Sequence, residues 1–264
     1  MTAQPLNTAA LTIAGSDSCG GAGIQADLKT FAARGVYGAS VITAVTAQNT
    51  LGVRSVTPIT AAEVRAQLRC VLEDLPVGAI KTGMLGSPDT ILAVADTLRD
   101  LGPDIPLVMD PVMVATSGAT LADPETVAAM QHLVRMASLV TPNLPELARL
   151  ADCPVESLAD AHRAGRLLLD AGASAVLVKG GHLPGDDVTD SLLTRDGEHS
   201  WSHPRIDGEF HGTGCTLSAA ITAALASGEE LEQAIGAALD YLIRAMRGGG
   251  LPRAGRLTLL RHHV

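Results

Sequence analysis

Short apolar runs alternate with amphipathic segments along most of the chain, a pattern that predicts strands alternating with helices. Strands are expected at 11–14, 40–46, 78–80, 107–109, 139–141 and 175–178. Helices are expected at 24–34, 60–73, 88–101, from 124, from 144, at 158–171, 213–227 and 230–247. Five helices are predicted to begin at a capping side chain: Thr60, Ser87, Asp123, Asn143 and Ser157. The alternation indicates a doubly wound α/β fold with a mostly parallel sheet.

Two segments depart from this alternation. Residues 191–194 and 199–202 flank Asp196-Gly197, and this spacing predicts a β-hairpin. Residues 248–264 are basic and show no clear period, so they are expected to be irregular. No repeat, low-complexity stretch or linker divides the chain, which favours a single domain over residues 1–264.

Composition indicates which residues form the core and which partners are disfavoured. Apolar residues make up 47% of the 264 positions and aromatic residues only 2%, so the core must be mainly aliphatic, as suits parallel strands covered on both faces. The formal net charge of −9 argues against nucleic acid or an anionic membrane surface as a partner. The cysteines show no CxxC spacing, no signal peptide is evident, and no apolar run reaches membrane-spanning length. These features favour a reduced, cytoplasmic protein that binds no membrane.

The stretch His211-Gly212-Thr213-Gly214-Cys215-Thr216 joins a glycine loop to a run of small residues that is expected to be helical. Such a stretch can be an ordinary entry into a helix. It also suits a phosphate group, because glycines let backbone N–H groups converge and the first N–H groups of a helix have no internal acceptor. The helix N-terminus is expected to lower the pKa of the Cys215 thiol. A phosphatase-type cysteine nucleophile is disfavoured, because the residues after Cys215 are small and apolar and include no arginine to clamp phosphate.

Six side chains lie just past the predicted carboxyl ends of strands: Asp17, Gln48, Met84, Asp110, Asn143 and Lys179. Ligands of open α/β sheets bind along this edge, so these residues and the glycine loop are expected to face one cleft. Singly, each has a simpler role, such as capping a helix for Asn143, but jointly they indicate an active site. The Gly20–Gly23 turn lacks G-x-G-x-x-G spacing, and Gln48 stands where a ribose-binding acid is needed. A dinucleotide-dependent oxidoreductase is therefore disfavoured.

Nine segments carry a resemblance to one known family. They are Ala14–Asp17, Gly20–Thr30, Ser40–Ala44, Ala47–Thr50, Lys81–Met84, Met109–Val114, Thr141–Glu146, Val178–His182 and His211–Thr216. Over about residues 10–245, the chain resembles the hydroxymethylpyrimidine/phosphomethylpyrimidine kinases of thiamine biosynthesis, in the ribokinase superfamily. The resemblance implies a three-layer α/β/α sandwich, ribokinase-like, with a central, mostly parallel sheet, usually in a homodimer. It also implies transfer of the γ-phosphoryl group of ATP to 4-amino-5-hydroxymethyl-2-methylpyrimidine, and then to its monophosphate.

The resemblance implies roles for individual residues, motif by motif. Those implied to bind the aminopyrimidine are Gln48, Gly15, Asp27 and Met84. Those implied to organise Mg²⁺ are Asp110 and Glu146. Those implied to lie near ATP are Lys179, Asn143 and Thr213. Those implied in catalysis, as an anion hole with a cysteine base, are Gly212, Thr213, Gly214 and Cys215.

The chain departs from the family's usual pattern at three places: Cys19 replaces a serine, Thr116 replaces a lysine, and the segment before His211 is shorter. Pyridoxal kinase is the nearest alternative, because related enzymes with the same cysteine loop phosphorylate pyridoxal. A pyrimidine-binding protein without turnover is a second alternative, although the intact glycine loop, Asp110 and Glu146 argue against it. A general sugar kinase is disfavoured, because such enzymes carry an aspartate in place of Cys215.

Overall fold

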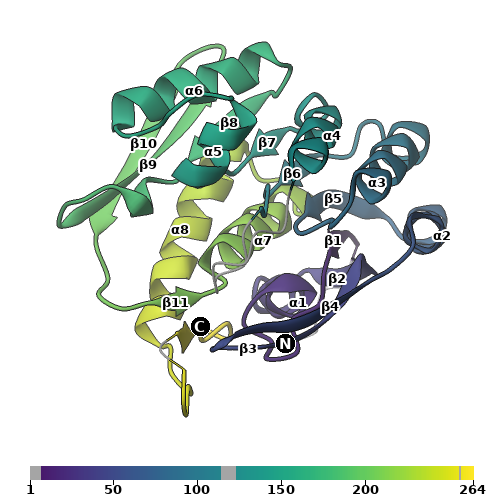
Figure 1. Cartoon of the computed structure of the whole chain (residues 1–264), viewed down its shortest axis with the longest axis horizontal. Coiled ribbons are helices and arrows are strands. Elements are labelled where there is room, and N and C mark those ends of the chain that lie inside the picture. Colours follow the sequence, from purple (N-terminus) through teal and green to yellow (C-terminus); the bar gives the residue numbers. More distant parts are fainter. Residues whose placement is uncertain (1–6, 114–122, 256) are drawn as a thin grey trace.

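The computed structural model describes residues 7–113, 123–255 and 257–264. Its centre is an eight-stranded sheet between two layers of helices (Figure 1). The strands of this sheet are Ala9–Ala14 (β1), Tyr37–Ile42 (β2), Val77–Thr82 (β5), Leu107–Met109 (β6), Leu139–Val140 (β7), Ala175–Val178 (β8), Asp187–Thr194 (β9) and Glu198–Pro204 (β10). Their order is β10-β9-β8-β7-β6-β5-β1-β2, and only β9 and β10 run antiparallel to their neighbours. The predicted α/β fold with a mostly parallel sheet is confirmed.

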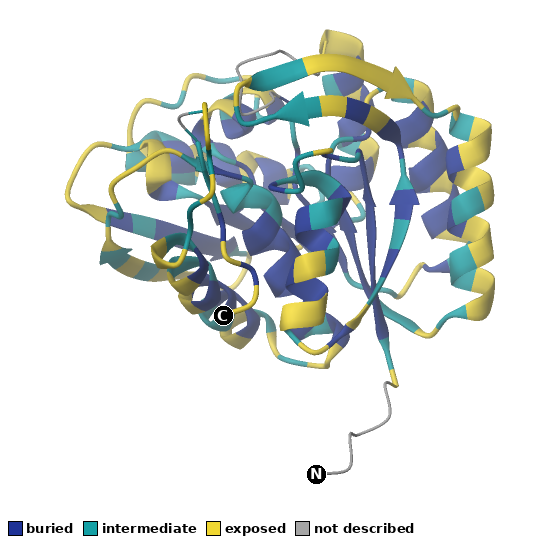
Figure 2. Cartoon of the chain, turned by 90° about the horizontal axis from the view of Figure 1, so that it is seen from below, coloured by how far each residue is buried: buried dark blue, intermediate teal, exposed yellow. Residues whose placement is uncertain are grey.

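Helices pack on both faces of the sheet because successive strand residues point to opposite sides. The described helices are Gly23–Ala33 (α1), Ala61–Asp74 (α2), Pro88–Leu101 (α3), Pro124–Val134 (α4), Leu144–Leu150 (α5), Leu158–Asp170 (α6), Thr213–Ala226 (α7) and Leu231–Arg247 (α8), with a 3₁₀ turn at Gly180–His182 (η1). Met109 packs in the cluster under α2 to α6, whereas its neighbour Val108 packs against α7 and α8. Helix α1 joins α7 on that second face through Phe31. The central strands are accordingly buried between the two layers (Figure 2).

All five predicted helix caps are present. In each, the capping side chain accepts a hydrogen bond from the backbone N–H three residues later, which gives one otherwise unpaired helix donor an acceptor. At α5 the bonding is reciprocal, because the Glu146 carboxylate also accepts from the Asn143 N–H. The predicted hairpin around Asp196-Gly197 is β9 and β10.

Two predictions about elements are wrong. Residues 40–46 do not form one strand, because β2 ends at Ile42 and a new strand, Ala44–Asn49 (β3), leaves the sheet and pairs with Gly52–Pro58 (β4) in a separate hairpin. The chain turns at Thr43, whose N–H donates to Ala14 and whose hydroxyl donates to the carbonyl of Met84 at 2.6 Å. The basic tail is also partly regular, since Thr258–Leu259 (β12) pairs with Phe210–His211 (β11).

Across the described ranges, every helix is too short or too polar to cross a lipid bilayer. Thr116 lies outside those ranges.

Candidate active site

The carboxyl ends of the parallel strands open onto a cavity of about 660 Å³. Eleven of the twelve residues to which the resemblance gives a role line this cavity: Gly15, Gln48, Met84, Asp110, Asn143, Glu146, Lys179, Gly212, Thr213, Gly214 and Cys215. Asp17, which was also expected in the cleft, lines it as well. The shared cleft expected at this edge of the sheet is therefore present. Gln48 reaches it from β3, within the separate hairpin, and not from the end of a sheet strand.

The glycine loop meets the N-terminus of α7 at this cavity. Gly212 is the N-cap of α7 and has a φ of +77°, a left-handed conformation that favours glycine. A Cβ atom at Gly212 would overlap the carbonyl oxygen of Gly21, so the loop also packs directly on the turn after β1. No side chain caps α7, and the N-terminal end of the helix faces the cavity through Thr213, Gly214 and Cys215. This geometry favours an anion at the end of the helix.

The structure corrects the expected charge of Cys215. Burial raises the pKa of its thiol to about 11, and the nearby carboxylates of Asp110 and Asp27 add to that rise, although Lys81 and the N–H of Gly23 oppose it. Burial and the neighbouring carboxylates thus keep the pKa of this thiol above its ordinary value. Cys215 is a protonated thiol near neutral pH and not a preformed thiolate.

Two carboxylates and one ammonium group form the charged end of the cavity. Lys179 Nζ lies 3.3 Å from Asp110 Oδ1, and Ser218 donates to Asp110 Oδ2 at 3.3 Å. The pKa of Glu146 is raised to about 7, mainly by burial and also by Asp110, although Lys179 and the N–H of Asn143 lower it. Burial lowers the pKa of Lys179, but Asp110 and Glu146 together raise it above its ordinary value. Glu146 and Asp110 are therefore close enough to repel each other when both are ionised.

Asp27 does not line the cavity. Its side chain is fully buried beneath it, where both carboxylate oxygens lie 2.7 Å from Lys81 Nζ and Oδ2 also accepts from the Thr12 hydroxyl at 2.6 Å. Burial alone would lower the pKa of Lys81, but Asp27 raises it well above the ordinary value. The resemblance implied that Asp27 binds the aminopyrimidine, but Asp27 is not among the residues that line the cavity. Its observed contacts are those of a buried ion pair.

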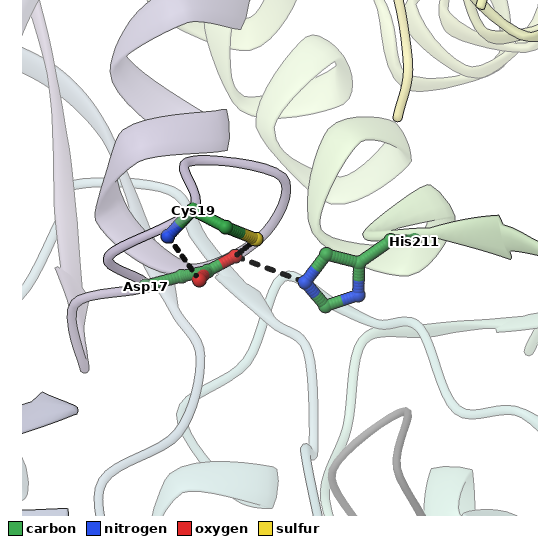
Figure 3. Close-up of side chains that lie close together, drawn as sticks. All are labelled: Asp17, Cys19 and His211. Carbon is green, nitrogen blue, oxygen red and sulfur yellow. Dashed lines mark hydrogen bonds and ion pairs between the residues drawn. The ribbon is translucent and has the colours of Figure 1, made fainter. Parts of the chain in front are cut away.

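Three side chains meet beside Gln48: those of Asp17, Cys19 and His211. Asp17 follows β1, Cys19 lies in the same turn, and His211 ends β11 next to the glycine loop (Figure 3). His211 Nε2 lies 2.9 Å from Asp17 Oδ2 and 3.3 Å from Gln48 Nε2. The contact joins the first turn of the chain to a segment 194 residues later.

Sequence reasoning nominated neither His211 nor Lys81 for the site, yet both line the cavity. Each was visible within a recognised segment, since His211 directly precedes Gly212 and Lys81 opens the Lys-Thr-Gly-Met stretch. Nothing local indicates that one pairs with Asp17 and the other with Asp27.

Known proteins that are similar to this chain in sequence and in structure are named as kinases. A profile of the phosphomethylpyrimidine kinase family matches residues 17–257. A hydroxymethylpyrimidine/phosphomethylpyrimidine kinase of Rhizobium meliloti (strain 1021) is 52% identical over 240 residues, 90% of each chain. The crystal structure of a phosphomethylpyrimidine kinase from Clostridium difficile 630 aligns with a TM-score of 0.81 at 42% identity, over 90% of this chain and 99% of that one. A pyridoxal kinase from Staphylococcus aureus in complex with ADP aligns with a TM-score of 0.89 at 33% identity, over 98% and 94%. The expected ribokinase-like fold is thereby confirmed.

Proposed function

The chain belongs to the phosphomethylpyrimidine kinase family, and we propose that its cleft phosphorylates 4-amino-5-hydroxymethyl-2-methylpyrimidine and then the monophosphate, with ATP as donor, for thiamine biosynthesis. It is a kinase. The observation that carries this conclusion is the 52% identity to an enzyme of that name across 90% of both chains. The cleft supports this conclusion, because one cavity contains the Gln48 amide, the N-terminus of α7 and the charged groups at its other end.

The pyrimidine binds at the end of the cavity formed by Gln48, Gly15 and Met84. A primary amide offers a donor beside an acceptor, which matches the ring nitrogen and amino group of the aminopyrimidine. A Cβ atom at Gly15 would overlap the terminal methyl group of Met84, so glycine there leaves room for the Met84 side chain.

The phosphoryl group is held at the other end. The N–H groups of Gly212 to Cys215 stabilise the charge of the transferring group, and Lys179 and Asn143 lie on the ATP side. Asp110 and Glu146 would hold Mg²⁺: both are buried oxygen donors whose mutual repulsion a divalent cation relieves. When bound, Mg²⁺ neutralises charge on the phosphates.

Cys215 accepts the proton of the substrate hydroxyl in the first phosphorylation. Because its pKa is about 11, only the minor thiolate form can do so, and the first step should be faster at higher pH. The second phosphorylation needs less help, since the attacking oxygen of a phosphate monoester is already ionised at neutral pH.

A homodimer in the cytoplasm is part of this proposal. The β3–β4 hairpin exposes three apolar side chains, those of Val45, Leu51 and Val56, and a second copy of the chain could cover them. All four cysteines are free thiols, as a reducing compartment favours.

The test is an assay of ADP release with Mg·ATP that compares hydroxymethylpyrimidine, its monophosphate and pyridoxal. We expect turnover on both pyrimidines and little on pyridoxal. Turnover mainly on pyridoxal, the substrate named for the similar Staphylococcus aureus enzyme, would replace the substrate but keep the phosphoryl transfer. Tight pyrimidine binding without turnover on any of the three would make the chain a binding protein.

A further inference from the structure

The Asp17 carboxylate accepts hydrogen bonds from several donors at once. Its Oδ1 accepts from the Cys19 N–H at 2.9 Å, and its Oδ2 accepts from the N–H groups of Gly21 and Ala22 at 3.0 and 2.8 Å. The Cys19 thiol donates to Oδ2 at 3.3 Å, and His211 Nε2 lies 2.9 Å from the same oxygen (Figure 3). The Asp17 and His211 side chains are each 2% exposed. With its oxygens already occupied, Asp17 is suited to organise hydrogen bonds and not to ligate a metal with Cys19 and His211.

These donors decide the charge of Asp17 and the proton position on His211. Burial raises the pKa of Asp17, but the hydrogen bonds from His211, Ala22 and Cys19 prevail and lower it to about 2. An ionised carboxylate only accepts hydrogen bonds. His211 Nε2 must therefore carry a proton and donate it to Asp17, whether the imidazole is neutral or charged.

This proton in turn decides which way the Gln48 amide faces. Gln48 Nε2, which only donates, lies 3.3 Å from the donor Nε2 of His211, and two donors repel. On its other side the amide contacts Thr46 Oγ1 at 3.5 Å, but that hydroxyl already donates to the Ser16 carbonyl at 2.8 Å and is free to accept. Exchanging the amide oxygen and nitrogen satisfies both neighbours: the oxygen accepts from His211 and the nitrogen donates to Thr46.

We propose that Asp17 and His211 are positioning residues that hold the Gln48 amide in this orientation and so select the aminopyrimidine and its direction in the cleft. The inference rests on the proposed role of Gln48 as the pyrimidine reader. The amide then presents its carbonyl on the His211 side, where the amino group of the substrate binds. The hydroxymethyl group is the ring neighbour of that amino group, so it is directed toward the His211 side as well, where Gly212 begins the glycine loop. Pyridoxal has no amino group next to its ring nitrogen, so it cannot form this pair of hydrogen bonds with the fixed amide.

The proton position can be measured on the wild-type protein alone. Long-range ¹H–¹⁵N spectra of ¹⁵N-histidine protein distinguish protonated from unprotonated ring nitrogens, and His211 is assigned by replacing the other seven of the eight histidines one at a time. We expect a protonated Nε2 at pH 7 to 8. An unprotonated Nε2 would overturn the inference.

The effect on the amide is measured by a double-mutant cycle of Asp17→Asn and Gln48→Ala. Asp17→Asn should raise the KM for hydroxymethylpyrimidine on the order of tenfold, change the KM for ATP by less than about twofold, and lower the preference for the pyrimidine over pyridoxal. In the Gln48→Ala background, Asp17→Asn should cause no further rise in the pyrimidine KM, because the group it orients is gone. The control is Cys70→Ala, which removes an exposed thiol on α2 away from the cavity and should leave all three constants within about twofold.

Equal rises in KM for ATP, hydroxymethylpyrimidine and pyridoxal would give Asp17 a structural role only and overturn the inference. A further rise in the pyrimidine KM in the Gln48→Ala background would do the same. If the Asp17→Asn variant does not fold, the proton position on His211 of the wild-type protein still tests the inference. Absence of pyrimidine turnover by the wild-type enzyme would refute the proposed function instead, so the two failures are distinct.

Discussion

Cys215 and Glu146 both have raised pKa values because each is buried near the carboxylate of Asp110. A site that handles phosphate thus concentrates negative charge of its own, and Lys179 and Lys81 offset only part of it. Bound cations and bound phosphate must therefore change the protonation of these groups, which makes pH a direct probe of single residues.

Cys215→Ala should lose most turnover on hydroxymethylpyrimidine, retain pyrimidine binding, and affect the second phosphorylation less than the first. With a thiol pKa of about 11, wild-type kcat/KM for the first step should rise about tenfold per pH unit between pH 7 and 9.5, because the thiolate fraction rises at that rate. Steady-state kinetics at each pH measure this. A wild-type profile as flat as that of the variant, with strong residual activity, would make Cys215 a spacer in the anion hole.

Glu146→Gln should weaken activation by Mg²⁺ and remove its pH dependence. In the wild type the carboxyl has a pKa of about 7, so below pH 7 the cation must displace a proton, and its apparent affinity should fall about tenfold per pH unit. Initial rates against free Mg²⁺ at fixed Mg·ATP, at pH 6 and 8, test this. The control is the exposed Glu125→Gln on α4, which should match the wild type. The same pH dependence in Glu146→Gln would remove Glu146 from the metal site.

Asp27→Ala should lower the free energy of unfolding by roughly 3 to 5 kcal/mol, because it leaves the Lys81 ammonium buried without its partner. The double change Asp27→Ala with Lys81→Met should recover most of that loss, since it removes both charges and Met is close to Lys in size. Urea unfolding of the three proteins gives the comparison. Equal destabilisation in the single and double variants would mean that packing, and not the unpaired charge, accounts for the loss.

At the scale of the elements, the C-terminal tail packs against the segment that leads into the glycine loop. Strand β12 pairs with β11, which leads directly into the glycine loop, and the Tyr241 hydroxyl on α8 donates to the His262 carbonyl at 2.6 Å. His262 Nε2 lies 3.2 Å from Thr216 Oγ1 in the first turns of α7. One short segment thus ties α7, α8 and the glycine loop together.

His262 should make the fold sensitive to mild acid. Burial, with smaller effects from Lys29 and His263, lowers its pKa to about 4, below the usual 6.5. The unfolded chain therefore takes up a proton first as pH falls, so this stability is complete above about pH 6.5 and is lost progressively down to about pH 4. Between pH 7 and 4.5, the wild type should lose roughly 2 to 3 kcal/mol more than His262→Asn, as measured by urea unfolding. Parallel losses in the two proteins would show that His262 is already protonated in the fold.

At the scale of the whole molecule, the β3–β4 hairpin stands apart from the main sheet and carries both Gln48 and exposed apolar side chains. An edge of two strands with exposed Val45 and Val56 is suited to pairing with another copy. Substrate binding and assembly would then share one element.

Val45→Lys with Val56→Lys should convert a homodimer into a monomer, because charges replace exposed apolar side chains on both faces of the hairpin. Light scattering after size exclusion gives the mass directly. Leu92→Lys, on the comparably exposed surface of α3, is the control and should remain dimeric. A wild-type monomer at micromolar concentration, or a dimer unaffected by the hairpin charges, would exclude this interface.

The local elements and the position of the cleft could be predicted from the sequence because their causes are local. A cap such as Thr60 acts on an N–H three residues away, and the apolar runs report which faces are buried. The carboxyl ends of parallel strands meet at one edge of the sheet, so Asp110 and Lys179 could be placed in one cleft although 69 residues separate them.

The tertiary structure alone decided what these residues contact and which charges they carry. The pairing of Asp27 with Lys81 spans 54 residues and that of Asp17 with His211 spans 194, and no periodicity encodes either. The pKa of Cys215 depends on burial and on charges from several elements, so the helix N-terminus visible in the sequence did not determine it. The turn at Thr43 likewise depends on hydrogen bonds to Ala14 and Met84. Sequence patterns specify backbone hydrogen bonding and burial over a few residues, whereas ionisation and pairing depend on every group that folding brings within a few ångströms.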